Sequence, residues 1–241
     1  SKEGVNRFVW KMQYDAPTKL DFEKPPIGGE DFFGGFGPSA LAGTYKVSVT
    51  VDGKTESTPA EVSYDPNQDI APDQARAITA MALKVRNELS AFNEMLNRVT
   101  AMQATLNGFE AGVTTDADKA KYKAALDQAQ ALDKKLGDLK DSVFNSDVQH
   151  DVIEDDLHYL AKLDGELQFL FFGTAGADPQ PMIQSITDLD TEVTPKLDDV
   201  IGRFNALLQK DVPDYNKTAY GVGAPTLMVG EPEAVRPAPA L

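Results

Sequence analysis

The longest regular pattern of apolar positions in the chain runs from Pro72 to Asn107. Within it, apolar side chains recur at intervals of three or four residues, with one skipped step at Gln103; they are Ile78, Ala82, Val85, Leu89, Phe92, Leu96, Val99 and Leu106. This spacing predicts one continuous α-helix with a single apolar stripe, roughly 50 Å long at the usual rise per residue. A helix of that length needs partners along its whole stripe, so the segments that follow it are expected to pack against it.

Two further stripes with helical spacing come next. Thr115 has the features of a helix cap, because Asp118 stands at the third position after it, as in a variant capping box. The stripe of this second helix is Tyr122, Leu126, Ala129, Leu132, Leu136, Leu139 and Val143. The stripe of a third helix, expected from about Ser146 to Gly173, is Ile153, Leu157, Leu160, Leu163, Leu167, Leu170 and Phe171.

A fourth stripe occupies the last third of the chain. Asp178 and Pro179 predict the start of this helix and Pro213 its end. Pro195 stands inside the helix and predicts a kink, because proline removes one backbone donor. The apolar residues of the fourth stripe are Met182, Ile186, Leu189, Val193, Leu197, Val200, Phe204 and Leu207.

The first part of the chain has the composition and the alternation of β-strands. The segment Val5–Tyr14 is rich in β-branched and aromatic residues, and one of its faces carries Phe8, Trp10, Met12 and Tyr14. The segment Thr44–Val51 alternates cleanly between apolar and polar residues. Asp52-Gly53 predicts a type I′ hairpin turn after it, and a return strand is expected from Lys54 to about Tyr64.

Three strands are too few to close a β-sandwich. The face formed by Tyr45, Val47, Val49 and Val51 would therefore lack a complete second layer. We expect the strand around Val5–Tyr14 to be covered in the assembly, either by upstream residues of a longer protein or by another chain, because exposed strand edges pair readily.

These patterns predict an α+β protein with three parts. Residues 1–67 are expected to form a partial Ig-like β-sandwich. Four striped helices with short connections predict an antiparallel up-down four-helix bundle over residues 68–216. Residues 217–241 are expected to form a tail, in which Thr226–Val229 has the composition of a short strand.

Composition narrows the range of partners. The net charge of −15 disfavours nucleic acid and anionic lipid, since both attract basic surfaces. The chain contains no cysteine, which excludes disulfides, thiolate metal sites and a cysteine nucleophile. The longest apolar run, Leu167–Phe172, is too short to cross a bilayer. We therefore expect neither nucleic-acid binding nor membrane insertion.

One histidine cluster invites a metal-site interpretation. His150, Glu154 and His158 are spaced four residues apart, and Asp155 with His158 makes an acidic-x-x-His pair. Helical di-metal sites use two such motifs together with carboxylates from two other helices, and no matching carboxylate interrupts the other stripes. A solvated helix face is therefore favoured over a surface zinc site.

Two other patterns have structural explanations. The glycines from Gly28 to Gly37 are not followed by the Gly-Lys-Ser/Thr of a phosphate loop, so a flexible connection is expected there. Phe8, Trp10 and Tyr14 could stack on a sugar, but aromatic packing explains them as well and is favoured. The sequence thus predicts no catalytic, cofactor-binding or metal-binding residues.

Several motifs nevertheless resemble a known family. The strand Gly4–Trp10 resembles the Gly-x-Asn-x-x-x-Trp strand of an Ig-like module of the flagellar hook-cap type. The segment Pro38–Gly53 resembles the Pro-Gly-Thr-Tyr strand and hairpin of that module, and Asp65-Pro66 its exit into helix. The segment Leu207–Asn216 is similar to the end of the helical region that follows the module. Together these motifs resemble the C-terminal region of large secreted bacterial proteins with BNR or sortilin-like β-propeller repeats, often labelled glycosyl hydrolases.

The resemblance implies a role without chemistry in this chain. In such proteins any catalytic residues lie in the propeller, and this chain has no propeller repeat. The chain is then expected to be a non-catalytic structural or interaction module, located in the periplasm, at the cell surface or outside the cell. Its partner would be the upstream propeller or another protein chain. The alternative is a ligand-sensing periplasmic four-helix module, which would need a pocket between its helices.

Overall fold

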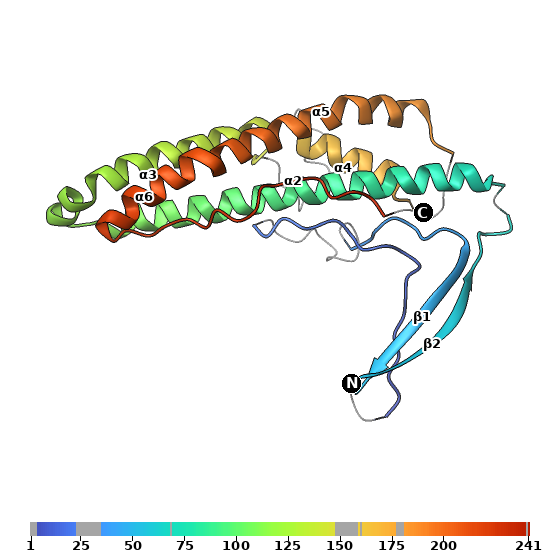
Figure 1. Cartoon of the computed structure of the whole chain (residues 1–241). Coiled ribbons are helices and arrows are strands. Elements are labelled where there is room, and N and C mark those ends of the chain that lie inside the picture. The colour runs from blue at the N-terminus through green and yellow to red at the C-terminus, as the bar shows by residue number, and fades with distance from the viewer. Residues whose placement is uncertain are drawn as a thin grey trace.

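A computed structural model describes residues 4–22, 35–67, 69–147, 159, 161–176, 181–239 and 241. It shows a mixed α+β protein, as the sequence predicts. Long helices form an elongated body, and a two-stranded antiparallel hairpin projects from the end at which the first long helix begins (Figure 1). We call helices α2 to α6 the helical body, and residues 4–14 together with 43–62 the arm.

Among the described residues, the helical body consists of five α-helices and one π-helical turn. They are α2 (Pro72–Gly112), α3 (Asp116–Val143), α4 (Leu163–Thr174), α5 (Gln184–Ala206), the π-helical turn η2 (Leu207–Asp211) and α6 (Val212–Val222). α2 packs on α3, α4 and α5, while α3 packs on α6 and α4 packs on α5. All eight residues of the predicted α2 stripe are buried, so its helical phase is confirmed.

The helices are not arranged as four full-length rods. α3 and α4 follow one another along α2, with α3 over its C-terminal half and α4 over its N-terminal half (Figure 1). Their 28 and 12 residues together match the 41 residues of α2. The stripe of α2 is therefore covered on this side by two shorter helices, and α5, η2 and α6 form the third rod.

The third rod continues past the end predicted from the sequence. Pro213 was expected to close the helix, but α6 extends to Val222 and is ended by Gly223, whose φ of 73° is left-handed. The π-helical turn Leu207–Asp211 immediately precedes Pro213. A wider turn separates the proline ring from the carbonyl of the preceding turn, so the helix tolerates a proline that would otherwise break it.

The other helix ends agree only in part with the sequence. Thr115 caps α3 as predicted, since its Oγ1 accepts a hydrogen bond from the Asp118 N–H at 3.1 Å. The third helix begins at Leu163 in the described part of the chain, and most of its expected first half lies outside the described residues. The predicted cap Asp178 also lies outside them, and α5 begins at Gln184.

The hairpin of the arm is confirmed. β1 (Gly43–Val51) pairs with β2 (Lys54–Val62), and Asp52 and Gly53 have φ angles of 49° and 77°, as a type I′ turn requires. The alternation along β1 is also as predicted, but its apolar face is not an inner face. Val47, Val49 and Val51 are 41%, 59% and 49% exposed, because no second layer of the described chain covers them.

The strand predicted over Val5–Tyr14 is wrong for this chain. Only Gln13 forms a β-bridge, with Ser39, through hydrogen bonds between Tyr14 N and Pro38 O and between Ala40 N and Met12 O. Met12 has a φ of 56°, which interrupts the alternation of the segment. A strand needs a neighbour that accepts and donates its backbone hydrogen bonds, and residues 4–11 belong to no strand or bridge of the structure.

Two extended segments outside the helices are bound to the helical body. Residues 15–22, which we call the N-terminal clip, lie along α2. Asn93 Nδ2 donates to the Thr18 carbonyl at 2.7 Å, and Asn97 holds the next residues of the clip by two bonds at 2.8 Å. The ring of Phe22 packs against the helical core.

The second segment, residues 224–236, returns along the body from the end of α6 and is called the C-terminal strap (Figure 1). Asn216 binds both backbone groups of Leu227, at 2.7 and 2.8 Å, and Asn205 binds both of Glu233, at 2.8 Å. Thr226–Val229 is therefore extended but is not a strand. The contacts of the chain cross the boundaries expected at residues 67 and 217.

Candidate functional site

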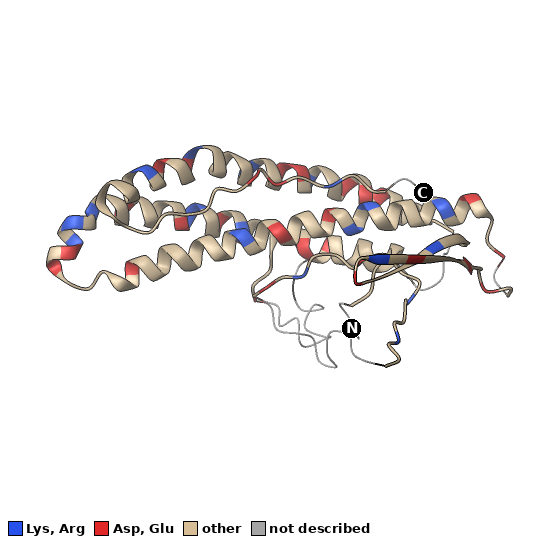
Figure 2. Cartoon of the chain, turned by 60° about the horizontal axis from the view of Figure 1, so that its bottom comes forward, with Lys and Arg blue, Asp and Glu red and all other residues tan. Residues whose placement is uncertain are grey.

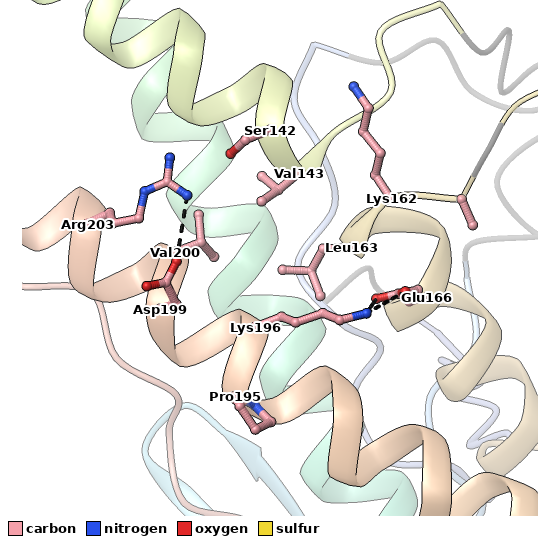
Figure 3. Close-up of a pocket in the computed structure, with 11 residues that line it drawn as sticks. Ser142, Val143, Lys162, Leu163, Glu166, Pro195, Lys196, Asp199, Val200 and Arg203 are labelled. Carbon is pink, nitrogen blue, oxygen red and sulfur yellow. Dashed lines mark hydrogen bonds and ion pairs between the residues drawn. The ribbon is translucent and has the colours of Figure 1, made fainter.

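A cleft of about 580 Å³ opens in the helical body where α3 ends and α4 begins (Figure 3). Its walls come from the last turn of α3, the first turn of α4 and the middle of α5. The residues that line it are Ser142, Val143, Ala161, Lys162, Leu163, Glu166, Pro195, Lys196, Asp199, Val200 and Arg203. The cleft thus arises from the tandem arrangement of α3 and α4, which leaves a junction opposite α5.

The charged side chains of the cleft are already paired. Lys196 Nζ lies 2.7 and 2.8 Å from the two carboxylate oxygens of Glu166, and Arg203 Nη1 lies 3.6 Å from Asp199 Oδ2 (Figure 3). Lys162 Nζ donates to two backbone carbonyls at the end of α3, at 2.7 and 3.1 Å. The cleft can hold a small anionic molecule only if these cations exchange partners.

None of the described residues that line the cleft is an activated nucleophile. Ser142 Oγ donates to the Leu139 carbonyl of its own helix at 2.7 Å, so its hydroxyl is engaged with the backbone. Glu166 is paired with Lys196 and is not opposed by a second free carboxylate across the cleft. The described lining of the cleft therefore favours electrostatic binding.

A partly buried charged cluster joins α2 to α5, and the sequence reasoning missed it. Lys84 Nζ lies 2.9 Å from Glu88 Oε1 and 2.5 Å from Asp190 Oδ1, and it donates to Thr194 Oγ1 at 2.8 Å. Burial alone lowers the pKa of Lys84, but its bonds to Asp190 and Glu88 outweigh that effect and raise the pKa. The signal was the Lys84–Glu88 spacing of four residues, which indicates a pair on one helix face. The cluster fixes one helix on the other.

The arm carries the largest group of exposed apolar side chains in the described residues. They are Val5, Phe8, Val9, Trp10, Met12, Val47, Val49 and Val51. The ring of Trp10 contacts Tyr45 edge-on at 5.1 Å, and its Nε1 donates to the Gln13 carbonyl at 3.0 Å. Trp10 stays 37% exposed and Phe8 89% exposed, so the aromatic residues of this segment do not form a buried core.

The residues singled out in the sequence have different outcomes. His150, Glu154, Asp155 and His158 lie outside the described residues, so the zinc-site alternative stays a prediction. Gly28 and Gly29 also lie outside them. A Cβ on Gly37 would fall 2.0 Å from the Tyr14 carbonyl oxygen, so this glycine permits a close approach of two backbones. The end of the glycine cluster is therefore structural.

Comparisons of the chain with protein-family models, with curated proteins and with solved structures gave no match. Over the residues that the structure describes, no helix combines the length and the apolar character that crossing a membrane requires. Of the features described, the exposed apolar side chains of the arm point most directly to a function.

Proposed function

We propose that this chain is a non-catalytic structural and interaction module of a secreted β-propeller protein of the BNR or sortilin-like type. The arm would be the exposed part of an Ig-like β module, and the helices an antiparallel bundle that carries it. The upstream propeller, or another protein chain, would cover the arm. The module would act in the periplasm, at the cell surface or outside the cell.

The exposed apolar surface of the arm carries this proposal. A two-stranded hairpin is at best marginally stable alone in water. The valine face of β1 and the side chain of Phe8 are also exposed apolar surface, which is unfavourable in water unless a partner covers it. Large exposed apolar patches mark interaction surfaces. The family motifs of the sequence support the same function, since Gly4–Trp10 and Pro38–Gly53 both belong to the arm.

The contrast between arm and body supports the proposal further. The helical body is closed on itself by the N-terminal clip and the C-terminal strap, whose backbones are bound by the side chains of Asn93, Asn205 and Asn216. Residues 4–11 of the arm show local bonds instead, from Asn6 Nδ2 to the Gly4 carbonyl at 3.1 Å and from Trp10 Nε1 to the Gln13 carbonyl at 3.0 Å. A rigid body with an uncovered arm is the architecture expected of a module that presents a docking surface.

The proposal is tested on the intact chain with the dye anilinonaphthalene sulfonate, which fluoresces on exposed apolar surface. We expect the native chain to bind the dye, and the double substitution Phe8→Ser with Val49→Thr to remove most of the signal. The matched substitution Phe169→Ser, at an α4 position that is 67% exposed, should leave most of it. In parallel, the chain should hydrolyse no glycosidase or sialidase substrate. Clear turnover, or dye binding that ignores the arm substitutions, would contradict the proposal.

The second candidate function is a ligand-sensing helical module, and the cleft between α3, α4 and α5 favours it. Its cations Lys162, Lys196 and Arg203 would hold a small anionic ligand. A thermal-shift screen of small carboxylates and sulfated sugars separates the two candidates, because a ligand that binds only the folded state raises the melting temperature. A shift that Lys196→Ala abolishes would support sensing over docking.

A further inference from the structure

The outer edge of β1 pairs with no strand of the part of the chain that the structure describes. The type I′ turn makes Val51 and Lys54 a hydrogen-bonded pair, and such pairs alternate with non-hydrogen-bonded pairs along an antiparallel ladder. Ser48 and Ser57 therefore form a non-hydrogen-bonded pair, and the 2.8 Å contact of their Oγ atoms agrees with the closer approach of such pairs. The backbone N–H and C=O of Ser48 then point away from β2. The same holds for every second residue of β1 counted from Ser48 in either direction.

The two edges of the hairpin are not equivalent. Pro59 of β2 stands opposite Lys46, at a position whose backbone nitrogen points outward. Proline has no N–H and its ring obstructs an incoming strand, so it interrupts the outer edge of β2. β1 contains no proline from Gly43 to Val51. An added strand can therefore pair with β1 over its whole length but not with β2.

The two faces of β1 define the side chains of such a strand. One face carries Val47, Val49 and Val51, and the opposite face carries Lys46 between hydroxyl residues. Side chains of a paired strand alternate between the same two faces, so every second residue would meet valines and the others would meet Lys46 and its neighbours.

Residues 4–14 and β1 together carry a charge opposite in sign to that of the whole chain. Residues 4–14 and β1 contain three cations, Arg7, Lys11 and Lys46, and no acidic residue, although the chain has a net charge of −15 (Figure 2). Neither Arg7 nor Lys46 has an ion-pair partner among the residues that the structure describes. The surface is therefore complementary to an acidic partner.

We propose that the outer edge of β1 binds an extended segment of a partner protein in which apolar residues alternate with Asp or Glu. The apolar residues pack on Val47, Val49 and Val51, and the acidic residues face Lys46. This inference rests on the proposed docking function of the arm, and it specifies the strand edge and the chemistry of the occupant. The backbone of the segment adds a third strand to the two strands of the hairpin, and a sheet of three strands is more stable than a two-stranded hairpin alone.

The single tryptophan of the chain provides the readout. Trp10 is partly exposed and contacts Tyr45 of β1, so a strand added beside β1 changes its surroundings. The probes are a peptide of about ten residues that alternates valine with glutamate, and a matched peptide with lysine in place of glutamate. We expect a saturable change in Trp10 fluorescence with the acidic peptide only, and weaker binding at high salt.

Two proline substitutions make a matched pair. Ser48→Pro removes an outward N–H from the edge of β1, whereas Ser57→Pro removes the corresponding group from β2, and both lose the same contact between hydroxyls. Neither breaks a hydrogen bond of the ladder itself. Ser48→Pro should lower the affinity of the chain for the acidic peptide by about tenfold or more. The Ser57→Pro variant should bind that peptide as tightly as the unmodified chain does. Lys46→Glu should reverse the preference toward the lysine peptide.

Several results would overturn the inference. Equal effects of the two proline substitutions, with both variants melting like the unmodified chain, would mean that the edge of β1 is not the site. Dimerisation that Ser48→Pro abolishes would assign the edge to a second copy. A Trp10 response to polygalacturonate that survives Ser48→Pro would assign the charge to a polysaccharide. No response to the acidic peptide, with the arm still binding dye and the chain without turnover, would overturn this inference alone; turnover would overturn the proposed function.

Discussion

Phe204→Ala should lower the free energy of unfolding by about 3–5 kcal/mol, among the largest effects expected of a single truncation in the helical body. Phe204 is fully buried between α5 and α2, and the guanidinium of Arg98 lies 5.0 Å from the centre of its ring. Truncation removes the buried ring and leaves a cavity. The long helices around it are held in place by their other contacts, so they cannot move to fill the cavity. Chemical denaturation, read by far-UV circular dichroism, measures the loss.

Phe169→Ala is the matched control for this prediction. Its ring is on α4 but is 67% exposed, so its truncation should change the free energy of unfolding by only about 0.5 kcal/mol. Leu89→Ala, at a buried α2 position of the same core, should cost about 2–5 kcal/mol. Equal free energies of unfolding for the Phe204→Ala and Phe169→Ala variants would contradict the burial of Phe204 between α5 and α2.

Arg98→Ala should cost about 3 kcal/mol, because it leaves a buried carboxylate without its partner. Arg98 Nη1 lies 3.1 Å from Glu233 Oε2, and its Nη2 donates to the Val229 carbonyl at 2.6 Å. The Glu233 side chain is only 8% exposed, so water cannot replace the lost guanidinium. Arg98 thereby binds the C-terminal strap to α2, beside the bond from Asn87 Nδ2 to the Arg236 carbonyl at 2.9 Å.

The cause of that loss can be separated from lost packing by a second substitution. Adding Glu233→Gln to Arg98→Ala removes the buried charge while keeping the shape, and should restore about 1–2 kcal/mol. Arg203→Ala, which removes an exposed pair at 3.6 Å, should cost under about 1 kcal/mol. If the double variant is less stable than Arg98→Ala alone, the strap is not held by this ion pair.

Local signals in the sequence predicted local structure well. The α2 stripe, the cap at Thr115 and the turn at Asp52-Gly53 each depend on residues within a few positions of one another, and each is found as predicted. Leu89 and Phe204 are both buried, so the helical phase was correct on two different helices. Such features are fixed by backbone geometry and need no knowledge of the rest of the chain.

Features that depend on distant residues could not be predicted in the same way. The segment Val5–Tyr14 has the composition of a strand, but pairing depends on a neighbour that the described chain does not supply. Pro213 has the sequence signal of a helix end, yet a π-helical turn before it lets the rod continue. The spacing of apolar residues does not predict that two helices, α3 and α4, pack one after the other along the same side of α2.

The clip, the strap and the cleft have no periodic signal at all. Asn205 and Asn216 are ordinary polar residues of a helix in the sequence, and only the fold shows that each binds the backbone of the strap. The cleft exists because α3 ends where α4 begins, and this junction follows from the tandem packing. The exposed valines of β1, by contrast, were visible in the sequence as a face without a cover.

Hydrogen–deuterium exchange on the intact chain tests the central claim most directly, namely that a closed helical body carries an uncovered arm. We predict that the amides of β1, β2 and residues 4–11 exchange rapidly, while those of α2 and the strap amides of Leu227 and Glu233 are protected. Protection of the arm equal to that of α2 in the monomeric chain would contradict the claim, because it would show that the arm is already covered.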